Sequence, residues 1–217
     1  MPARALSKLS FFEEVEILRR DDHRLYHQCR INQTLHLISA CVFLFVYVYI
    51  WIDPPRASIL GWFGAMWVRQ TGHFFFEPRG FDRANNLSNA RKESIKVGFN
   101  VYRKIALISA WAVIPILLWV DSTLLGLMSP AGSTDVLVER IGWAWLGLAG
   151  FGLLARTLWL TAMRSAQTGA AWFFKILTDP FHNVREFWRS PLYLLSGQRY
   201  EPLQFVDYYT EQSSART

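Results

Sequence analysis

Four blocks of mainly apolar residues, separated by charged segments, constrain the fold of this chain more than any other feature. The blocks cover residues 35–52, 58–76, 105–120 and 141–163. A helix needs roughly 20 such residues to cross the hydrocarbon core of a bilayer. Charged residues make up only 18% of the chain, whereas soluble domains carry about 25%. The sequence therefore predicts an all-α integral membrane bundle of about four transmembrane helices.

The remaining segments complete this layout. Pro54 and Pro55 force a turn between the first two spans, because proline cannot continue a helix from its N-terminal side. Pro115 lies inside the third span, where membrane helices tolerate a kink. Residues 170–177 are too few to cross the bilayer and predict a short interfacial helix. We expect one helical membrane domain over residues 1–200 and a polar C-terminal tail over residues 201–217.

The distribution of Lys and Arg predicts the orientation in the membrane. Segments 1–32, 77–104 and 164–217 hold nineteen of these residues, whereas the two opposite loops hold only Arg56 and Arg140. Cytoplasmic loops are enriched in Lys and Arg. Both termini and the long middle loop are therefore expected in the cytoplasm.

Tryptophans and the net charge fit the same topology. Trp51, Trp62, Trp119 and Trp143 lie near the far ends of their spans, where an aromatic belt is expected. The net charge of +6 is explained by the cytoplasmic loops and gives no support to nucleic-acid binding. We expect a multi-pass protein in contact with membrane lipids. Its location would be the inner membrane in a bacterium or the endoplasmic reticulum in a eukaryote.

All five histidines lie on the predicted cytoplasmic side, and several belong to polar pairs at the i,i+4 spacing that places two side chains on one helix face. The pairs are His23 with His27, Asn32 with His36, and His73 with Glu77. Arg69 and Gln70 also interrupt the second span. Ionisable groups at this depth are costly unless they face the bundle interior and find partners. The convergence predicts a functional site at the cytoplasmic ends of the first two spans.

Imidazole nitrogens with a nearby carboxylate favour a first-row transition metal, and open coordination positions suit Fe(II) oxygen chemistry. A carboxylate or amide can instead hold the second ring nitrogen of a ligand histidine. A single histidine at a helix end is more often an interfacial hydrogen-bonding group, and we keep that interpretation for His23 and His182. Arg69 either pairs with Glu77 or extends its charge to the inner face.

Two stretches resemble the 2-hydroxy fatty acid dioxygenase family of membrane proteins. The first contains Tyr26-His27, Asn32 and His36, and the second contains Trp67, Gln70, Gly72-His73 and Glu77. The second stretch is one residue shorter between Gln70 and Gly72 than the family pattern. The resemblance covers roughly residues 23–120.

The resemblance implies a non-haem Fe(II) enzyme that uses O2 to oxidise a long-chain 2-hydroxy fatty acid to the acid one carbon shorter. It implies that His27, His36 and His73 are the iron ligands and that Glu77 is a fourth ligand or a base beside them. Asn32 and Gln70 would orient the ligands. A lipid acid that enters from the bilayer would place its carboxylate near Arg69, since a guanidinium suits a bidentate contact with a carboxylate.

Three other classes stay open at this point. A di-iron lipid hydroxylase or desaturase would need more clustered histidines than the five present. A haem-binding electron carrier would use two axial histidines on facing helices, for which His36 and His73 are candidates. A non-catalytic membrane scaffold would bind nothing at these side chains.

Overall fold

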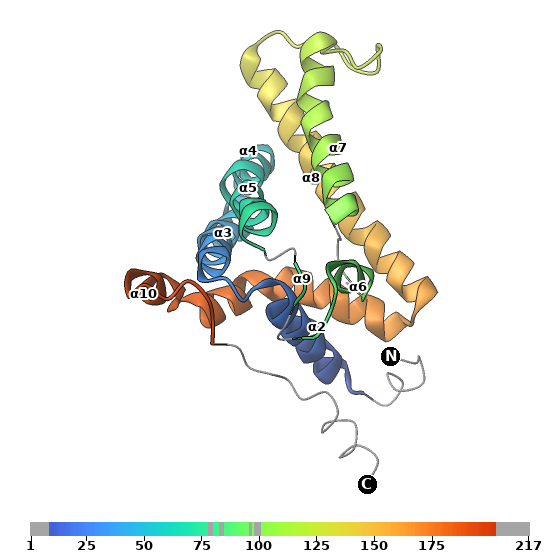
Figure 1. Ribbon diagram of the computed structural model, residues 1–217. Helices are drawn as coiled ribbons and strands as arrows, with labels where there is room; N and C mark the ends of the chain where they lie inside the picture. Colours follow the sequence, from blue (N-terminus) through green and yellow to red (C-terminus); the bar gives the residue numbers. More distant parts are fainter. Residues whose placement is uncertain (1–8, 78–79, 83–84, 96, 98–100, 203–217) are drawn as a thin grey trace.

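Every regular element in the described part of the chain is helical, which confirms the predicted all-α class. The computed structural model describes residues 9–77, 80–82, 85–95, 97 and 101–202. In chain order, the elements are α2 (Phe11–Tyr26), α3 (Arg30–Tyr49), α4 (Pro54–Leu60), the π-helix η1 (Gly61–Met66), α5 (Trp67–Thr71), the π-helix η2 (Gly72–Phe76), α6 (Asn89–Ile95), α7 (Val101–Val120), α8 (Thr134–Met163), α9 (Ala166–Phe187) and α10 (Ser190–Leu195) (Figure 1). Most of the predicted C-terminal tail, residues 203–217, lies outside the described residues.

Three helices, α3, α7 and α8, are long and apolar enough to cross a membrane. Their side chains point mostly outward: within the most hydrophobic window of each helix, only 33%, 11% and 6% of the residues are buried in the protein. Large exposed side chains include Phe45, Leu117 and Phe151. In lipid these side chains would be in a favourable apolar solvent. Three of the four predicted spans are thus helices with the length and composition of a membrane span.

The predicted second span is helical from Pro54 to Phe76 but is not one regular α-helix. It begins at Asp53, whose side chain accepts the backbone N–H of Arg56. The π-helices η1 and η2 alternate with α4 and α5, and the backbone stays right-handed helical at Gly61 and Gly72. π-Helical turns shift the side-chain register and occur often at functional sites. Each of the four pieces alone is too short to span.

The apolar helices form two hairpins, one made of α3 and the segment from α4 to η2, the other of α7 and α8. These hairpins cross rather than run parallel. Figure 1 shows α7 and α8 side-on and α4 and α5 nearly end-on. They meet where α4 contacts α8, because Gly142 of α8 lies against the carbonyl group of Pro55 and a Cβ atom there would overlap it. Trp62, Trp111 and Trp145 form one buried cluster at this crossing.

Trp62 therefore does not face an aromatic belt, and that expectation is wrong. Its exposed fraction is 6%, whereas Trp51 is 87% exposed and Trp119 is 77% exposed. The position of Trp62 in the sequence indicated its depth but not the direction of its side chain, which packs against Trp111 with ring centroids 4.2 Å apart.

The short helix predicted over residues 170–177 is the middle of α9, which is 22 residues long. Ser165 caps its N-terminus by accepting the backbone N–H of Thr168. The apolar pattern breaks at Lys175 and Asp179, yet both side chains are buried, so the helix continues past the point where its sequence turns polar. α9 contacts α2, α3 and α8, and Figure 1 shows it beside these helices.

Candidate metal centre

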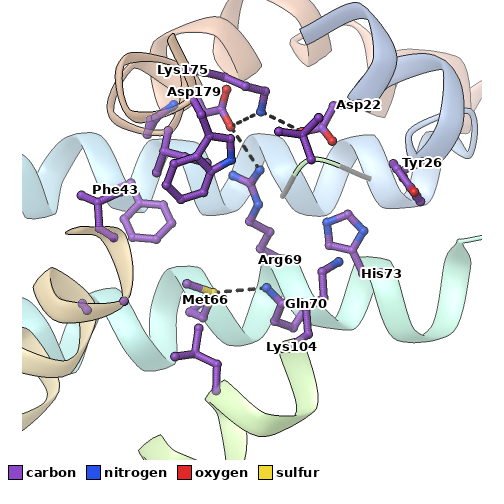
Figure 2. Close-up of a pocket in the computed structure, with 18 of the residues that line it drawn as sticks. Asp22, Tyr26, Phe43, Met66, Arg69, Gln70, His73, Lys104, Lys175 and Asp179 are labelled. Carbon is purple, nitrogen blue, oxygen red and sulfur yellow. Dashed lines mark hydrogen bonds and ion pairs between the residues drawn. The ribbon is translucent and has the colours of Figure 1, made fainter. Parts of the chain in front are cut away.

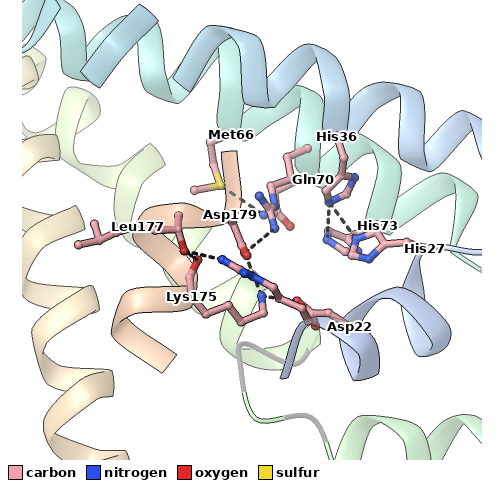
Figure 3. A network of polar contacts seen from close by, with 12 residues as sticks. Asp22, His27, His36, Met66, Gln70, His73, Lys175, Leu177 and Asp179 are labelled. Carbon is pink, nitrogen blue, oxygen red and sulfur yellow. Dashed lines mark hydrogen bonds and ion pairs between the residues drawn. The ribbon is translucent and has the colours of Figure 1, made fainter. Parts of the chain in front are cut away.

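Three histidines from three elements meet in the interior. His27 is the residue after α2, His36 lies on α3 and His73 lies on η2. The Nε2 atom of His36 is 3.1 Å from Nε2 of His27 and 3.2 Å from Nε2 of His73. The ligand nitrogens of the three residues all lie within 4.8 Å of one another. Figure 3 shows the three rings converging from different helices.

The opposite ring nitrogens of two of these histidines are fixed by hydrogen bonds. Nδ1 of His36 donates to the backbone carbonyl of Asn32 at 2.9 Å, and Nδ1 of His73 donates to Glu77 Oε2 at 2.8 Å. A neutral imidazole with its proton on Nδ1 presents a lone pair on Nε2. The Nε2 lone pairs of His36 and His73 therefore face each other. A bound cation would accept these lone pairs together, and an Nε2–H of His27 or a shared proton would satisfy them one contact at a time.

Two of the three nitrogen separations match those around a single metal ion. Metal–imidazole bonds of about 2.0–2.1 Å at angles between octahedral and tetrahedral place neighbouring nitrogens about 3–3.4 Å apart. The two measured separations, 3.1 and 3.2 Å, lie in that range. Three protein ligands also leave coordination positions open, as catalytic sites do. The cluster can hold a metal ion, and Glu77 contacts the opposite nitrogen of His73, as carboxylates beside metal-bound histidines commonly do.

Asn32 and Gly72 bring the ligand-bearing helices together. Asn32 is fully buried, and its Nδ2 donates to the backbone carbonyl of Tyr26 at 2.8 Å. A Cβ atom at Gly72 would overlap the amide oxygen of Asn32, so only glycine allows η2 to approach α3 this closely. Asn32 was expected to orient a ligand, and its backbone carbonyl is the group that contacts His36.

Arg69 and Gln70 lie on the same helix as His73 but contact other groups. Arg69 forms an ion pair with Asp179 at 3.5 Å. The sequence left two interpretations of Arg69 open, pairing with Glu77 and extension to the inner face. Neither describes this contact, because Arg69 pairs with Asp179 and Glu77 pairs with His73. Gln70 Nε2 donates to the sulfur of Met66 at 3.3 Å, and its buried Oε1 has no hydrogen-bond partner.

His23 and His182 stay outside the three-nitrogen cluster. Nε2 of His23 is 2.9 Å from a carboxylate oxygen of Glu201. His182 borders a small cavity of about 10 Å³ that His27 and Asn183 also line, a volume that approaches the space needed for one water molecule. Burial lowers the pKa of His182 below its ordinary value.

A buried ion network on α9 was not predicted from the sequence. Lys175 Nζ donates to Asp22 at 2.7 Å and to Asp179 at 2.9 Å, and Asp179 also forms an ion pair with Arg69 (Figure 2). Burial opposes the charge on Lys175, but the two carboxylates outweigh it and hold the pKa of the ammonium group above its usual value. The i,i+4 spacing of Lys175 and Asp179 was the available signal, since such a pair inside an apolar run must find partners.

A cavity of about 410 Å³ lies beside this network and reaches His73. Its walls come from both hairpins and from α9, and most are apolar; they include Phe43, Leu107, Trp111, Leu148 and Trp172. Its charged and polar lining residues include both signs of charge: Asp21, Asp22, Arg69, Gln70, His73, Lys104, Lys175 and Asp179. Figure 2 shows Arg69 extending across this space toward Asp179, with Gln70 and His73 along the same helix. Pockets of this kind, apolar with a few convergent polar groups, are typical of small-ligand sites.

Comparison with known proteins identifies no relative: no family model, no curated protein and no solved structure matches this chain. The site must therefore be interpreted from its own geometry. It combines three converging imidazoles, a cationic side chain and an apolar cavity within one buried region.

Proposed function

We propose that this chain is a membrane enzyme that holds Fe(II) through His27, His36 and His73 and uses O2 to shorten a 2-hydroxy fatty acid by one carbon. The observation that carries the proposal is the meeting of three Nε2 atoms beside an apolar cavity whose polar end contains a guanidinium group. Imidazole ligands suit Zn, Cu, Fe and Ni. The choice of iron, and of the reaction, rests on the resemblance of the two histidine-bearing stretches to the dioxygenase family.

We also propose that α4 to η2 forms a fourth span and that both termini face the cytoplasm. The supporting observations are the Lys and Arg distribution and the grouping of α2, α6 and α9 at the end of the α7–α8 hairpin opposite its connecting loop (Figure 1). Reporter fusions at Pro54 and at Gly132 should both give a non-cytoplasmic signal. A cytoplasmic signal at either position would contradict the four-span topology.

The net reaction balances without a separate reductant. One 2-hydroxy acid and one O2 give the shorter acid, CO2 and water. The bond between C1 and C2 breaks, C2 becomes a carboxyl carbon, C1 leaves as CO2, and the four electrons removed from the substrate reduce O2. Bound Fe(II) would supply the redox centre for this chemistry.

Arg69 would receive the substrate carboxylate at the polar end of the cavity. Its present partner, Asp179, contacts it at 3.5 Å, whereas Lys175 contacts the same carboxylate at 2.9 Å. Asp179 thus keeps a closer cationic partner when the guanidinium group turns to a ligand. A planar guanidinium binds a carboxylate through two parallel hydrogen bonds, which fixes the orientation of the acid beside His73.

The acyl chain would occupy the apolar part of the cavity, between Trp111 and Leu148 on one hairpin and Phe43 on the other. Burial of each methylene group contributes about 0.8 kcal/mol, so a long chain binds much more tightly than a short one. Glu77 holds the proton on Nδ1 of His73 and thereby keeps Nε2 as the ligand atom.

The test is metal analysis followed by turnover. Purified protein should contain about one iron per chain and should convert 2-hydroxyhexadecanoate and O2 to pentadecanoate, detected by mass spectrometry. Arg69→Leu should lower the apparent affinity for the acid while retaining iron, and hexadecanoate should not react. Iron-loaded protein that leaves 2-hydroxy acids of several lengths unchanged would contradict the reaction. A Soret band in the purified protein would support the haem-binding alternative instead.

A further inference from the structure

His27 is the ligand histidine with the least support from regular structure. His36 and His73 lie within helical segments, whereas His27 follows the last residue of α2 with φ −119° and ψ 32°. The backbone N–H of His27 still donates to the carbonyl of His23 at 2.8 Å, but the chain from His27 to Cys29 then leaves the helix to connect α2 to α3. Side chains on connecting segments are positioned less rigidly than those on helices. Some other part of the protein must therefore fix the place of this ligand.

A C-terminal segment, residues 199–201, lies against this connection. The backbone N–H of Arg30 donates to the carbonyl of Arg199 at 2.9 Å, and the N–H of Glu201 donates to the carbonyl of Gln28 at 3.0 Å. Cys29 and Tyr200 thus form an isolated antiparallel β-bridge. We call residues 199–201 the C-terminal strap. Its backbone hydrogen bonds join two parts of the chain that lie far apart in sequence.

The carboxylate of Glu201 accepts three hydrogen bonds beneath the strap. The donors are His23 Nε2 at 2.9 Å, Arg30 Nη1 at 3.0 Å and Gln33 Nε2 at 2.8 Å. Gln33 is fully buried, and its Nε2 also donates to the backbone carbonyl of His27. The amide oxygen of Gln33 in turn accepts from Ser190 Oγ at 2.6 Å. One buried amide therefore joins Glu201 to the backbone of the ligand residue.

We infer that the C-terminal strap is part of the metal centre and that Glu201 is a positioning residue, which sets the place of His27 through Gln33. The inference rests on the proposed metal-binding function of the three histidines. Partners of metal ligands that lie outside the coordination shell commonly change metal affinity by about 10–100-fold when removed. The polar tail predicted over residues 201–217 therefore begins with a residue of the site.

The geometry distinguishes two substitutions of Glu201. Both Arg30 and Gln33 donate to the same oxygen, Oε1, whereas His23 contacts Oε2. Glutamine can place its amide oxygen at the Oε1 position and donate from its nitrogen to neutral His23. Glu201→Gln should therefore preserve the position of Gln33, and Glu201→Ala should not.

The test uses Co(II) as the probe and the full chain in detergent. Co(II) affinity is measured by competition with a chelator, and the visible spectrum of bound Co(II) reports the ligand geometry. Glu201→Ala should weaken binding about 10–100-fold and change the spectrum, whereas Glu201→Gln should remain within about 3-fold of the wild type. Glu201→Asp, which withdraws the carboxylate by one methylene group, should be intermediate and serves if the alanine variant does not fold.

Glu13→Ala is the matched control for a merely structural effect. Glu13 accepts the backbone N–H of Ser10 at the opposite end of α2, so its loss destabilises the same helix without touching the strap. It should lower the melting temperature but leave Co(II) affinity unchanged. The inference about Glu201 would be overturned if Glu201→Ala bound Co(II) as tightly as the wild type, or if Glu201→Ala and Glu13→Ala lost equal Co(II) affinity. Either result would leave the metal centre itself standing. A wild-type protein that binds no metal would overturn the metal centre as well.

Discussion

The region that carries the histidines and the α7–α8 hairpin are both helical and apolar on the outside, but their interiors differ. On α3 the fully buried residues are polar: Asn32, Gln33, His36 and Ser39 are each 0% exposed. On the α7–α8 hairpin the buried side chains are apolar or aromatic; they are Trp111, Leu118, Trp145 and Leu160. Burial of a polar group costs free energy unless it is hydrogen-bonded. The first region therefore buries polar groups that need partners, whereas the buried side chains of the second are apolar or aromatic.

The two regions also differ in their central polar contacts, although each contains a buried polar side-chain atom without a hydrogen-bond partner, Arg156 Nε in the hairpin among them. In the hairpin, the indole N–H of Trp145 donates to the carbonyl of Trp111 at 2.9 Å and the reverse contact is 3.5 Å, so the contact is complete in itself. In the histidine region, Nε2 atoms face one another and Asn32 Oδ1 and Gln70 Oε1 have no hydrogen-bond partner. Each buried polar atom of this kind needs an explanation, and an ordered water molecule or an ion is one of them.

The largest expected effect is the loss of a ligand. His36→Ala removes the nitrogen that contacts both other histidines. It should reduce metal affinity by more than about 100-fold, since loss of an outer partner alone costs up to that much. Metal content after dialysis provides the measurement. Trp111→Phe in the hairpin is the control and should retain the metal; equal metal loss in both variants would erase the distinction between the two regions.

The next effect concerns the partner of a ligand. Glu77→Leu leaves Nδ1 of His73 without its carboxylate and should lower metal affinity by about 10–100-fold. Glu77→Gln, which can still accept the N–H, should lose less. Isothermal titration of the metal-free variants would measure the difference. An unchanged affinity in Glu77→Leu would show that the tautomer of His73 does not depend on this contact.

Gly72 in the histidine region and Gly147 in the α7–α8 hairpin allow the same Gly→Ala substitution to be compared in both regions. Gly72→Ala places a methyl group onto the amide of Asn32 and should destabilise the protein by about 1–3 kcal/mol, as overpacking does. Gly147 on α8 has no atom within 4 Å of an added Cβ, so Gly147→Ala should be neutral or stabilise by up to about 1 kcal/mol through helix propensity. Thermal unfolding in one detergent compares them. Similar stabilities of the two variants would mean that α3 and η2 are not as closely packed as the geometry requires.

The smallest effect is the pH dependence of the His23–Glu201 pair. Burial opposes charge on both groups, but their mutual contact outweighs it, so the pKa of His23 lies above its ordinary 6.5 and that of Glu201 lies below its ordinary 4.5. The contribution of His23 is complete below pH 6.5 and is lost as the pH rises through its raised pKa. The contribution of Glu201 is complete above pH 4.5 and is lost on acidification.

The wild type should therefore melt above His23→Gln, and the difference in melting temperature should be largest between pH 4.5 and pH 6.5. Measurements at about pH 6 and about pH 9 should show the difference shrinking at the higher pH. An equal difference in melting temperature at both pH values would show that the charges of the pair do not stabilise the C-terminal strap.

The sequence predicted the helical class and the meeting of His27, His36 and His73, because both follow from local signals. Apolar blocks of spanning length identify helices, and i,i+4 polar pairs identify the faces that must turn inward. The depth of His36 and His73 in neighbouring spans then placed them together. The identity of the metal and the reaction stay predictions.

The ion network and the C-terminal strap could not be predicted in this way. Glu201 and Gln33 lie 168 positions apart, and no local pattern links them. Asp179 meets Arg69 only because α9 continues beyond Lys175 and folds back across α3. The π-helical turns of η1 and η2 also change the register of Arg69 and Gln70 in a way that α-helical spacing does not anticipate. Tertiary contacts decide these positions, and they leave only weak traces in the sequence.

The bridge between Cys29 and Tyr200 places a buried thiol where its labelling rate can report local opening of the structure. Cys29 is 2% exposed, so an alkylating reagent can reach its thiol only when the surrounding structure opens. At high reagent concentration the labelling rate would equal the opening rate, and at low concentration it would give the equilibrium population of the open form. Cys41→Ser removes the other, exposed thiol. In this variant the rate of Cys29 alkylation would thus report how often the structure around the bridge to Tyr200 opens.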